Sequence, residues 1–406
     1  MAKRVLIITY HFPPINVIAS RRFGEMAPLM QQFNWEPFVL TTKSQGDLPV
    51  LIPEKNIIRI GEHCDSGKRL VKEEGFRGIP LFLKPVYFLY RKFNIRLESV
   101  DRFVFSWRKE VLKNIEKIRE INPDVIIAST SPYVCLRLAR DISRELKKPW
   151  VADFRDAASL YNNCRFPFIK TIDKIIDKRI VKTASLITTV GSYLAELMSE
   201  FYGKKAEVVS NGFKKEKLEF LNGKPNNRPK IIYYAGRFHP HRIKAVKLLI
   251  DWLALGKPDI RLVIRSMGPE QANKEILRRI KEKNISDKVS LLDPAPFSKI
   301  LEEEKQADFL AIFEDLSGEE VFKATMPGKL FEYLPFAGTI LVVARKDSNM
   351  NSVLQETNKG EVVSNFEELD DFFSKPRPEP NIEALKTYTR ELQTQKLCNL
   401  LDALAS

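Results

Sequence analysis

The sequence predicts an α/β protein with two doubly wound domains in tandem. Three observations lead to this prediction. Short apolar runs rich in β-branched residues alternate with amphipathic helical patterns, as in parallel sheets that are covered on both faces. This alternation stops once, in a charged stretch at 213–229, and then begins again. The length of 406 residues also exceeds that of one ordinary domain.

The first domain, 1–212, begins with a strand close to the N-terminus. The run RVLIITY at 4–10 is continuous and apolar, as a central parallel strand should be. A loop follows, and Ser20 is a suitable N-cap for the next helix. Further strands are expected at 36–42, 123–130, 149–156, 185–191 and 206–212, with helical patterns such as 131–148 between them.

The second domain, 230–378, is expected to repeat this alternation after the linker at 213–229, which contains Gly, Asn and Pro. Its strands are predicted at 230–238, 260–266, 289–293, 309–314 and 339–344, and its helices at 243–255, 269–284 and 297–306. The last segment, 379–406, is predicted to be an amphipathic helix that packs back across the first domain. Because ligands bind beyond the carboxyl ends of parallel strands, a cleft between two facing domains is the expected site.

Composition and charge restrict the partners. The net charge of +14 suits nucleic acid, anionic lipid or an anionic substrate, but no zinc-finger, RNP or basic-zipper pattern is present, so no nucleic-acid partner is expected. Basic and aromatic residues are interleaved over 81–114, which favours a surface that lies on an anionic membrane. The alternative is an ordinary pair of amphipathic helices packed on the first domain.

The cysteines and the apolar runs indicate a cytoplasmic protein. The four cysteines are scattered and no two have metal-ligand spacing, which predicts reduced thiols. The longest apolar runs are far shorter than a membrane span, and no signal-peptide pattern occurs at the N-terminus.

The stretch TMPGKLFEYLPFAG at 325–338 places an acid, Glu332, inside a short apolar helix that follows a Pro-Gly pair. One interpretation is an acid that faces water near the positive end of a helix dipole. The other is a ligand site, because Gly328 permits close approach to the backbone and a carboxylate accepts hydrogen bonds from sugar hydroxyls. Pro335 is expected to shorten or kink this helix.

Several short motifs fall in the order and at the spacings of a known enzyme family. They are ITYHFPP…ASRR, WEPFVLTT, NPDVIIASTSPY, KPWVADFRDA, VVSNGF, YYAGRF, QADFLAIFE and PGKLFEYLPFAGTILVV. Together they resemble the retaining, nucleotide-sugar-dependent glycosyltransferases of family four, which have the GT-B fold of two Rossmann-like domains facing across a cleft. The resemblance covers about residues 4–365 and is nearest to the branch that acts on cell-surface polysaccharides.

The resemblance implies roles for individual residues. Glu332 matches the acid that binds the ribose, and Arg237 matches the arginine that touches the leaving diphosphate. Either Arg242, at the position of the family's partner lysine, or Lys244 supplies a second cation. The other implied site residues are Pro327, Gly328 and Lys329, in the loop that meets ribose and diphosphate, and Asp156, in the acceptor-side cleft next to Arg155, where many members carry His. From the residues alone, Arg237 could instead form a solvated or inter-domain ion pair, and Asp153 could cap the next helix.

The implied function is transfer of a sugar from a nucleotide-diphosphate sugar to a hydroxyl of a glycan or polyprenyl-linked acceptor, in the cytoplasm or on the inner face of the cell membrane. Fixed cations can stabilise the leaving diphosphate. The sequence contains no Asp-x-Asp motif, so neither a metal nor another cofactor is expected. In such retaining enzymes the leaving phosphate helps to deprotonate the acceptor, so no enzyme nucleophile is required.

The sequence departs from the family pattern at two places. The first loop has Asn16 and Val17 where the family usually has two glycines. The position of the family's first acid is Ala324, and the nearest acids are Glu319 and Glu320. These departures keep alternatives open: a non-catalytic protein of this fold that binds a nucleotide sugar or a partner protein, or another enzyme on the same fold, such as a sugar-nucleotide epimerase or a phosphorylase.

Overall fold

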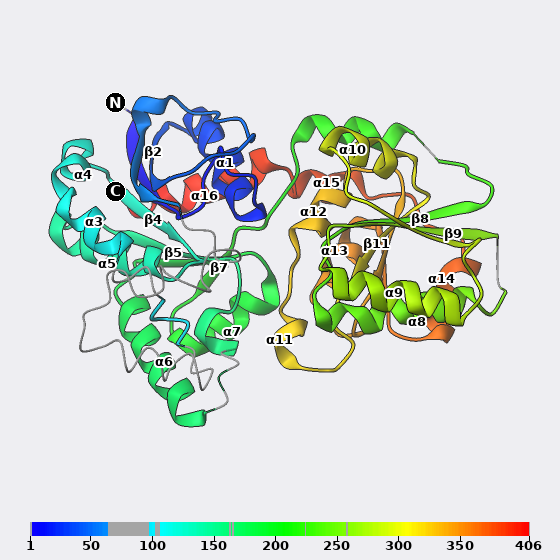
Figure 1. Cartoon of the computed structure of the whole chain (residues 1–406). Helices are drawn as coiled ribbons and strands as arrows, with labels where there is room; N and C mark the ends of the chain where they lie inside the picture. Colours follow the sequence, from blue (N-terminus) through cyan, green and yellow to red (C-terminus); the bar gives the residue numbers. More distant parts are fainter. Residues whose placement is uncertain are drawn as a thin grey trace. The chain divides into compact units, whose positions relative to one another are not determined.

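The computed structural model describes residues 2–63, 97–101, 106–161, 164, 166–223, 225–256 and 259–405. The chain forms two compact units (Figure 1). Unit 1 comprises Met1–Asn211 together with Arg390–Ser406, and unit 2 comprises Gly212–Thr389. The expected fold class is confirmed, because each unit is built on one parallel sheet flanked by helices.

Unit 1 contains a seven-stranded sheet in the order β3-β2-β1-β4-β5-β6-β7, and every pair of neighbours is parallel. The strands are β1 Lys3–Ile8, β2 Trp35–Lys43, β3 Ile57–Glu62, β4 Val125–Ser129, β5 Trp150–Phe154, β6 Leu186–Thr189 and β7 Ala206–Val208. The sequence pattern did not predict β3, which lies at the edge of the sheet and has only two buried residues. Its weak apolar signal follows from that edge position.

The helices of unit 1 are α1 Ile18–Met30, α3 Trp107–Lys113, α4 Ile115–Ile121, α5 Val134–Leu146, α6 Pro167–Val181, α7 Ser192–Tyr202 and α16 Arg390–Asp402. The prediction that Ser20 caps the first helix is wrong. The helix starts at Ile18 after Val17, which makes no side-chain cap, and Ser20 is fully buried inside it. Burial of this helix face, rather than a capping hydrogen bond, positions the helix start.

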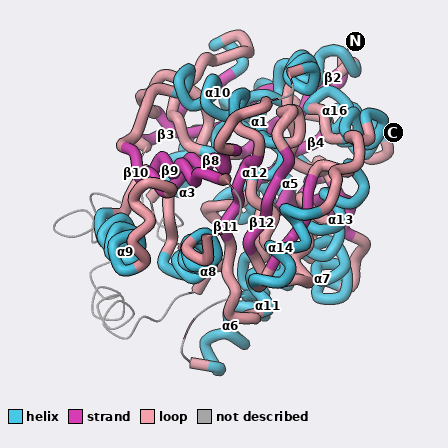
Figure 2. The backbone as a smooth tube through the Cα atoms, turned by 90° about the vertical axis from the view of Figure 1, so that its right-hand side faces the viewer, coloured by secondary structure: helices cyan, strands magenta, loops and turns pink. Residues whose placement is uncertain are grey.

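Unit 2 contains a six-stranded parallel sheet in the order β10-β9-β8-β11-β12-β13. The strands are β8 Lys230–Gly236, β9 Ile260–Ser266, β10 Val289–Leu292, β11 Phe309–Phe313, β12 Thr339–Val343 and β13 Gly360–Val363. Figure 2 shows β8, β11 and β12 side by side. Helices α8, α9 and α14 share one hydrophobic core with this sheet, and α10 lies on its other side (Figure 1).

The helices of unit 2 are α8 Ile243–Leu253, α9 Glu270–Glu282, α10 Phe297–Gln306, α11 Glu320–Lys323, α12 Gly328–Tyr333, α13 Met350–Thr357, α14 Phe366–Ser374 and α15 Ile382–Thr387. Helix α12 has only six residues and ends two positions before Pro335, as expected from the proline. Among the described residues, no helix is both long and apolar enough to cross a membrane.

The chain passes between the units twice. The stretch that reads as a linker contains a 3-10 helix at Lys215–Asn222. The final segment forms two helices rather than one. Helix α15 belongs to unit 2, and α16 belongs to unit 1, where it packs against α1. The break falls at Tyr388 and Thr389, where the backbone N–H of Phe213 donates a hydrogen bond to the carbonyl of Tyr388 at 3.1 Å.

Candidate functional site

Each sheet contains a topological switch point beside its first strand. The next two strands in the sequence lie on one side of that strand, and all later strands lie on its other side. In unit 2 this point lies between β8 and β11, which are neighbours although they are far apart in sequence. Arg237 follows the last residue of β8, and Glu314 follows the last residue of β11. Parallel strands bring both residues to the same edge, where ligands bind in open α/β sheets.

Arg237 is exposed, and its guanidinium makes no hydrogen bond or ion pair with any residue that the structure describes. Its backbone is fixed, however. The carbonyl oxygen accepts hydrogen bonds from the Tyr234 hydroxyl at 3.2 Å and from Nη1 of Arg242 at 3.4 Å. No described residue forms the ion pair considered for Arg237, so its guanidinium remains available to a ligand.

Arg242 is paired with a residue that the sequence reasoning missed. Its Nη2 donates a hydrogen bond to Oε1 of Glu314 at 2.6 Å, and the Glu314 side chain is almost fully buried. The other carboxylate oxygen, Oε2, lies 3.7 Å from Nε2 of His241. The sequence signal that could have indicated Glu314 is the position of this acid directly after a buried strand. The charge of Arg242 is therefore balanced by that of Glu314. Lys244, in contrast, is exposed and has no ion-pair partner among the described residues.

The two histidines of the HPH sequence also border this edge. The rings of His239 and His241 are stacked with centroids 5.6 Å apart, and His241 stacks on Phe322 of α11 at 4.6 Å. Burial lowers the pKa of His239, and the charges of Arg242, His241 and Arg237 lower it further. His239 is thereby favoured in its neutral form beside this group of cations.

Helix α12 brings the second predicted group to the same edge. Its Lys329 lies against the end of β8, since Cε of Lys329 is 3.5 Å from where a Cβ on Gly236 would be. The Lys329 ammonium lies 4.9 Å from the ring centroid of Tyr333 and 4.0 Å from Oε1 of Glu304. A Cβ on Gly236 would also meet the Tyr234 hydroxyl at 2.8 Å, so a larger residue here would displace the Tyr234 side chain.

Glu332 is half-buried on α12, three residues after Lys329. Pro327 is the N-cap residue of this helix in an extended conformation, and Gly328 is its first residue. The structure therefore brings Arg237, Arg242 and α12 together in unit 2, and Lys244 follows as the second residue of α8. Ala324, at the position of the first acid, is buried. Glu320 pairs with Arg345 at 3.2 Å.

Asp156, the predicted acceptor-side residue, lies in unit 1 just after β5. It is exposed, and its Oδ1 accepts a hydrogen bond from the backbone N–H of Ala158 at 3.2 Å. The adjacent Arg155 donates hydrogen bonds to the carbonyl oxygens of Thr130 and Ser131. Asp153 does not cap a helix. It forms a buried, bidentate ion pair with Arg22 at 2.7 and 3.0 Å.

A histidine pair at the same edge of the first sheet was also missed. Nδ1 of His11, after β1, lies 3.0 Å from Nε2 of His63, after β3. Burial, together with the charges of His63 and Arg155, lowers the pKa of His11 to about 3. The sequence did not indicate this pair, because the two residues are far apart in the chain. They come together only because β1 and β3 end at the same edge of the sheet.

Most of the segment 81–114, predicted to lie on a membrane, falls outside the described residues, which include only 97–101 and 106–114 of it. In that described part, Trp107 is buried and donates a hydrogen bond to the carbonyl of Ile60 at 2.8 Å. Arg108 forms an ion pair with Asp141 at 2.7 Å. These two residues pack on unit 1. Among the described residues, no three His, Cys, Asp or Glu side chains are grouped as a metal site would require.

Comparison with solved structures gives the fold. HepE from Anabaena, solved with UDP and glucose, matches at a TM-score of 0.61 and 14% identity, over 98% of this chain and 99% of HepE. A glycosyltransferase from Rickettsia africae matches at 0.65 and 13%, over 99% and 98%. The lipopolysaccharide outer core galactosyltransferase WaaB matches at 0.62 and 13%, over 98% and 99%. No protein-family model and no curated protein matches the sequence. The chain is therefore similar over its whole length to structures with the GT-B fold.

Proposed function

We propose that this protein is a retaining, metal-independent glycosyltransferase that moves a sugar from a nucleotide-diphosphate sugar to a hydroxyl of a glycan or polyprenyl-linked acceptor, in cell-surface polysaccharide biosynthesis. The observation that carries the proposal is the Arg237 guanidinium, which pairs with no described residue, at the switch point of the unit 2 sheet, with Lys329 of α12 placed against the preceding residue. The GT-B fold, seen in HepE with UDP and glucose, supports a nucleotide-sugar donor.

The chemistry of the donor explains why cationic side chains are needed at this edge of the unit 2 sheet. When the bond between sugar and phosphate breaks, negative charge grows on the leaving diphosphate. Arg237 is fixed at its carbonyl oxygen and can place its guanidinium on that charge without losing another partner. Lys244, which has no ion-pair partner among the described residues, is the second cation in this proposal, and Arg242, held by Glu314, fixes the backbone of Arg237. Arg242 then contributes mainly as a positioning residue.

The helix α12 completes the donor site in this proposal. The carboxylate of Glu332 accepts hydrogen bonds from the ribose hydroxyls, and the segment Pro327–Lys329 meets the ribose and diphosphate. The leaving phosphate takes the proton of the acceptor hydroxyl on the same face of the sugar, which retains the anomeric configuration. The proposal of metal independence rests on these protein cations and on a sequence without an Asp-x-Asp motif.

The acceptor side is assigned to unit 1, where Asp156 is exposed at the carboxyl edge of the sheet. We place the protein in the cytoplasm, at the inner face of the cell membrane, where polyprenyl-linked acceptors are found. Docking through 81–114 remains a prediction, since residues 81–96 and 102–105 lie outside the described part of the chain.

A second candidate is a non-catalytic protein that binds a nucleotide sugar. It is favoured by the buried Ala324 at the first-acid position and by the neutralised charge of Arg242. This candidate predicts donor binding without turnover.

One assay distinguishes the candidates. The protein is incubated with UDP-, GDP- and ADP-sugars and a polyprenyl-linked acceptor, with and without EDTA. Sugar transfer that survives EDTA, with the anomeric configuration retained, supports the proposal. Donor binding without transfer supports the non-catalytic candidate, and interconversion of the sugar without acceptor indicates an epimerase. Activity that EDTA abolishes and magnesium restores would contradict metal independence. A thermal-shift panel identifies the base, since a ligand at 100 Kd stabilises its unit by about 2.7 kcal/mol.

A further inference from the structure

Helix α6 of unit 1 buries its acidic residues and exposes the basic residues at its C-terminal end. It lies at the lower end of unit 1 in Figure 1 and carries two acidic and four basic residues. Both acids, Asp173 and Asp177, are completely buried. Of the basic residues, Lys178, Arg179 and Lys182 are exposed on the outer side, whereas Lys170, seven residues before Asp177, is half-buried on the side of the acids. An ordinary surface helix would instead mix both signs on its exposed face.

The buried acids explain how α6 is held. Asp173 accepts hydrogen bonds from the backbone N–H groups of Glu98 and Ser99, both at 2.9 Å. Asp177 accepts hydrogen bonds from the hydroxyls of Tyr133, Ser159 and Tyr202, the last at 2.9 Å. Because the inner face makes these contacts, the outer face is not needed to hold α6 in place.

The outer face combines apolar and basic side chains. Phe168 is 73% exposed and Ile175 is 45% exposed, and their spacing of seven residues places them on one side of the helix. Lys178, Arg179 and Lys182 are exposed beyond them. Lys170 and Lys174 are half-buried, and no ion pair joins any of these five basic residues to another residue that the structure describes.

The neighbouring helix α7 exposes two acids, Glu196 and Glu200. Its Phe201 lies under two of the cations, with the ammonium of Lys178 at 4.4 Å and that of Lys174 at 6.0 Å from the ring centroid. Positive charge on α6 exceeds these two acids, so the surface remains cationic. We call the outward side chains Phe168, Ile175, Lys178, Arg179 and Lys182 the α6 face.

We propose that the α6 face docks on an anionic lipid membrane. Apolar side chains that project singly from a row of cations are typical of helices that lie in the headgroup region of a bilayer. A second copy of this chain is disfavoured, because two cationic faces would repel each other. A large protein interface would need a broader apolar surface than two isolated side chains provide. This inference does not depend on glycosyl transfer.

Vesicle co-sedimentation of the full chain tests the proposal. Each basic residue near an anionic surface strengthens binding about fivefold. The double variant Lys178→Glu/Arg179→Glu should therefore weaken binding to phosphatidylglycerol-containing vesicles by at least about 20-fold. Phe168→Ser should weaken it about tenfold through lost apolar burial. Pure phosphatidylcholine vesicles should bind weakly, and high salt should reduce binding to the anionic ones.

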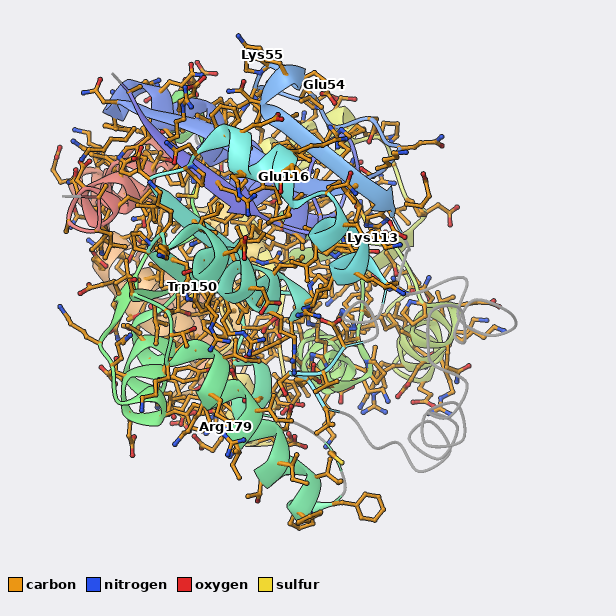
Figure 3. All side chains as sticks on the ribbon, turned by 90° about the vertical axis from the view of Figure 1, so that its left-hand side faces the viewer. Glu54, Lys55, Lys113, Glu116, Trp150 and Arg179 are labelled. Atoms are coloured by element: carbon orange, nitrogen blue, oxygen red, sulfur yellow. The ribbon has the colours of Figure 1, made fainter. Side chains whose placement is uncertain are left out.

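A matched control changes the same amount of charge elsewhere in unit 1. Lys55→Glu/Lys117→Glu alters two exposed lysines, and Figure 3 shows Lys55 at the opposite end of the unit from Arg179. This control should change binding by less than about threefold, because salt screens the attraction between the bilayer and charges that are remote from it. Unchanged thermal unfolding shows that each variant is folded.

Several results would overturn the proposal. If both double variants weaken binding equally, only the net charge of the chain attracts it to lipid. If the wild-type chain binds no vesicle, the α6 face serves another partner, such as an acidic protein. If Lys178→Glu/Arg179→Glu binds as the wild type does while Arg91→Glu/Lys92→Glu/Arg96→Glu does not, the membrane surface belongs to 81–114.

Discussion

At the scale of single residues, Glu332 offers the most direct test of the donor site. It lies one turn along a helix whose Lys329 touches the end of β8. If its carboxylate accepts hydrogen bonds from both ribose hydroxyls, Glu332→Gln should weaken binding of the nucleoside diphosphate by about 1.5–3 kcal/mol, the range for hydrogen bonds to a charged group. Calorimetric titration measures this change, with the exposed Glu367→Gln on α14 as the control. Unchanged affinity would return Glu332 to the role of a surface acid.

Arg237 should act on the chemical step more than on donor binding. Diphosphate charge is greater in the transition state than in the bound donor, so Arg237→Ala should lower kcat by about a hundredfold or more and raise the donor KM much less. Steady-state kinetics measures both constants. Arg278→Ala, which removes an exposed arginine paired with Glu282, is the control and should change neither. An effect of Arg237→Ala on KM alone would contradict the assigned role.

Glu314 should matter for the stability of unit 2, because it is the buried partner of Arg242. Glu314→Gln keeps the shape and removes the charge, which should lower the free energy of unfolding of unit 2 by about 1.5–3 kcal/mol. Chemical denaturation measures the change. Glu320→Gln, at the exposed partner of Arg345, should cost less than about 1 kcal/mol. Equal effects of the two variants would mean that burial of Glu314 contributes nothing.

At the scale of elements, the anchoring of α6 predicts a pH dependence. Burial outweighs the three hydroxyl donors and raises the pKa of Asp177 to about 6, above its value of roughly 3.9 in an unfolded chain. The folded protein therefore binds this proton more tightly than the unfolded chain does. The contribution of Asp177 to the free energy of unfolding is fully present below about pH 4 and is lost as the pH rises to about 6.

Asp177→Asn should remove this dependence. The free energy of unfolding of the variant minus that of the wild type should increase by about 2–3 kcal/mol between pH 4 and pH 7, since one pKa unit corresponds to about 1.4 kcal/mol. Denaturant titrations of both proteins at a series of pH values measure this difference. A difference that stays constant over the range would show that the Asp177 carboxyl has an ordinary pKa.

At the scale of the whole molecule, the return of the chain at Arg390 ties the C-terminus to unit 1. The α16 residues Leu397, Cys398 and Leu401 lie in the same hydrophobic core as β1, β2 and α1. Leu401→Ala should lower the free energy of unfolding of unit 1 by about 2–5 kcal/mol and leave unit 2 unchanged. Leu392→Ala, at a position of α16 that is 42% exposed, is the matched control and should cost much less.

Hydrogen exchange resolves the two units in this experiment. Faster exchange confined to the strands of unit 1 would support the assignment. Equal loss of protection in both sheets would contradict it, because the core of α16 would then stabilise more than one unit.

The sheets could be predicted from the sequence because central parallel strands are buried on both faces. Such strands read as continuous apolar runs, as 4–10 and 339–344 do. The edge strand β3 and the short β13 lack that signal and were missed. Short stretches of sequence were also sufficient to predict the positions of Arg237 and Glu332 within their motifs and the end of the helix before Pro335.

Pairings across the fold were decided by the tertiary structure alone. Arg242 meets Glu314, and Arg22 meets Asp153, only because parallel strands and their helices bring distant residues to one edge or one core. The sequence by itself determined the two parallel sheets, because buried strands appear as continuous apolar runs. It also determined the cations near the second sheet, because these residues lie within short motifs. Which cation lacks a partner among the described residues, and which charged residues of α6 are buried, depended on contacts that no local pattern specifies.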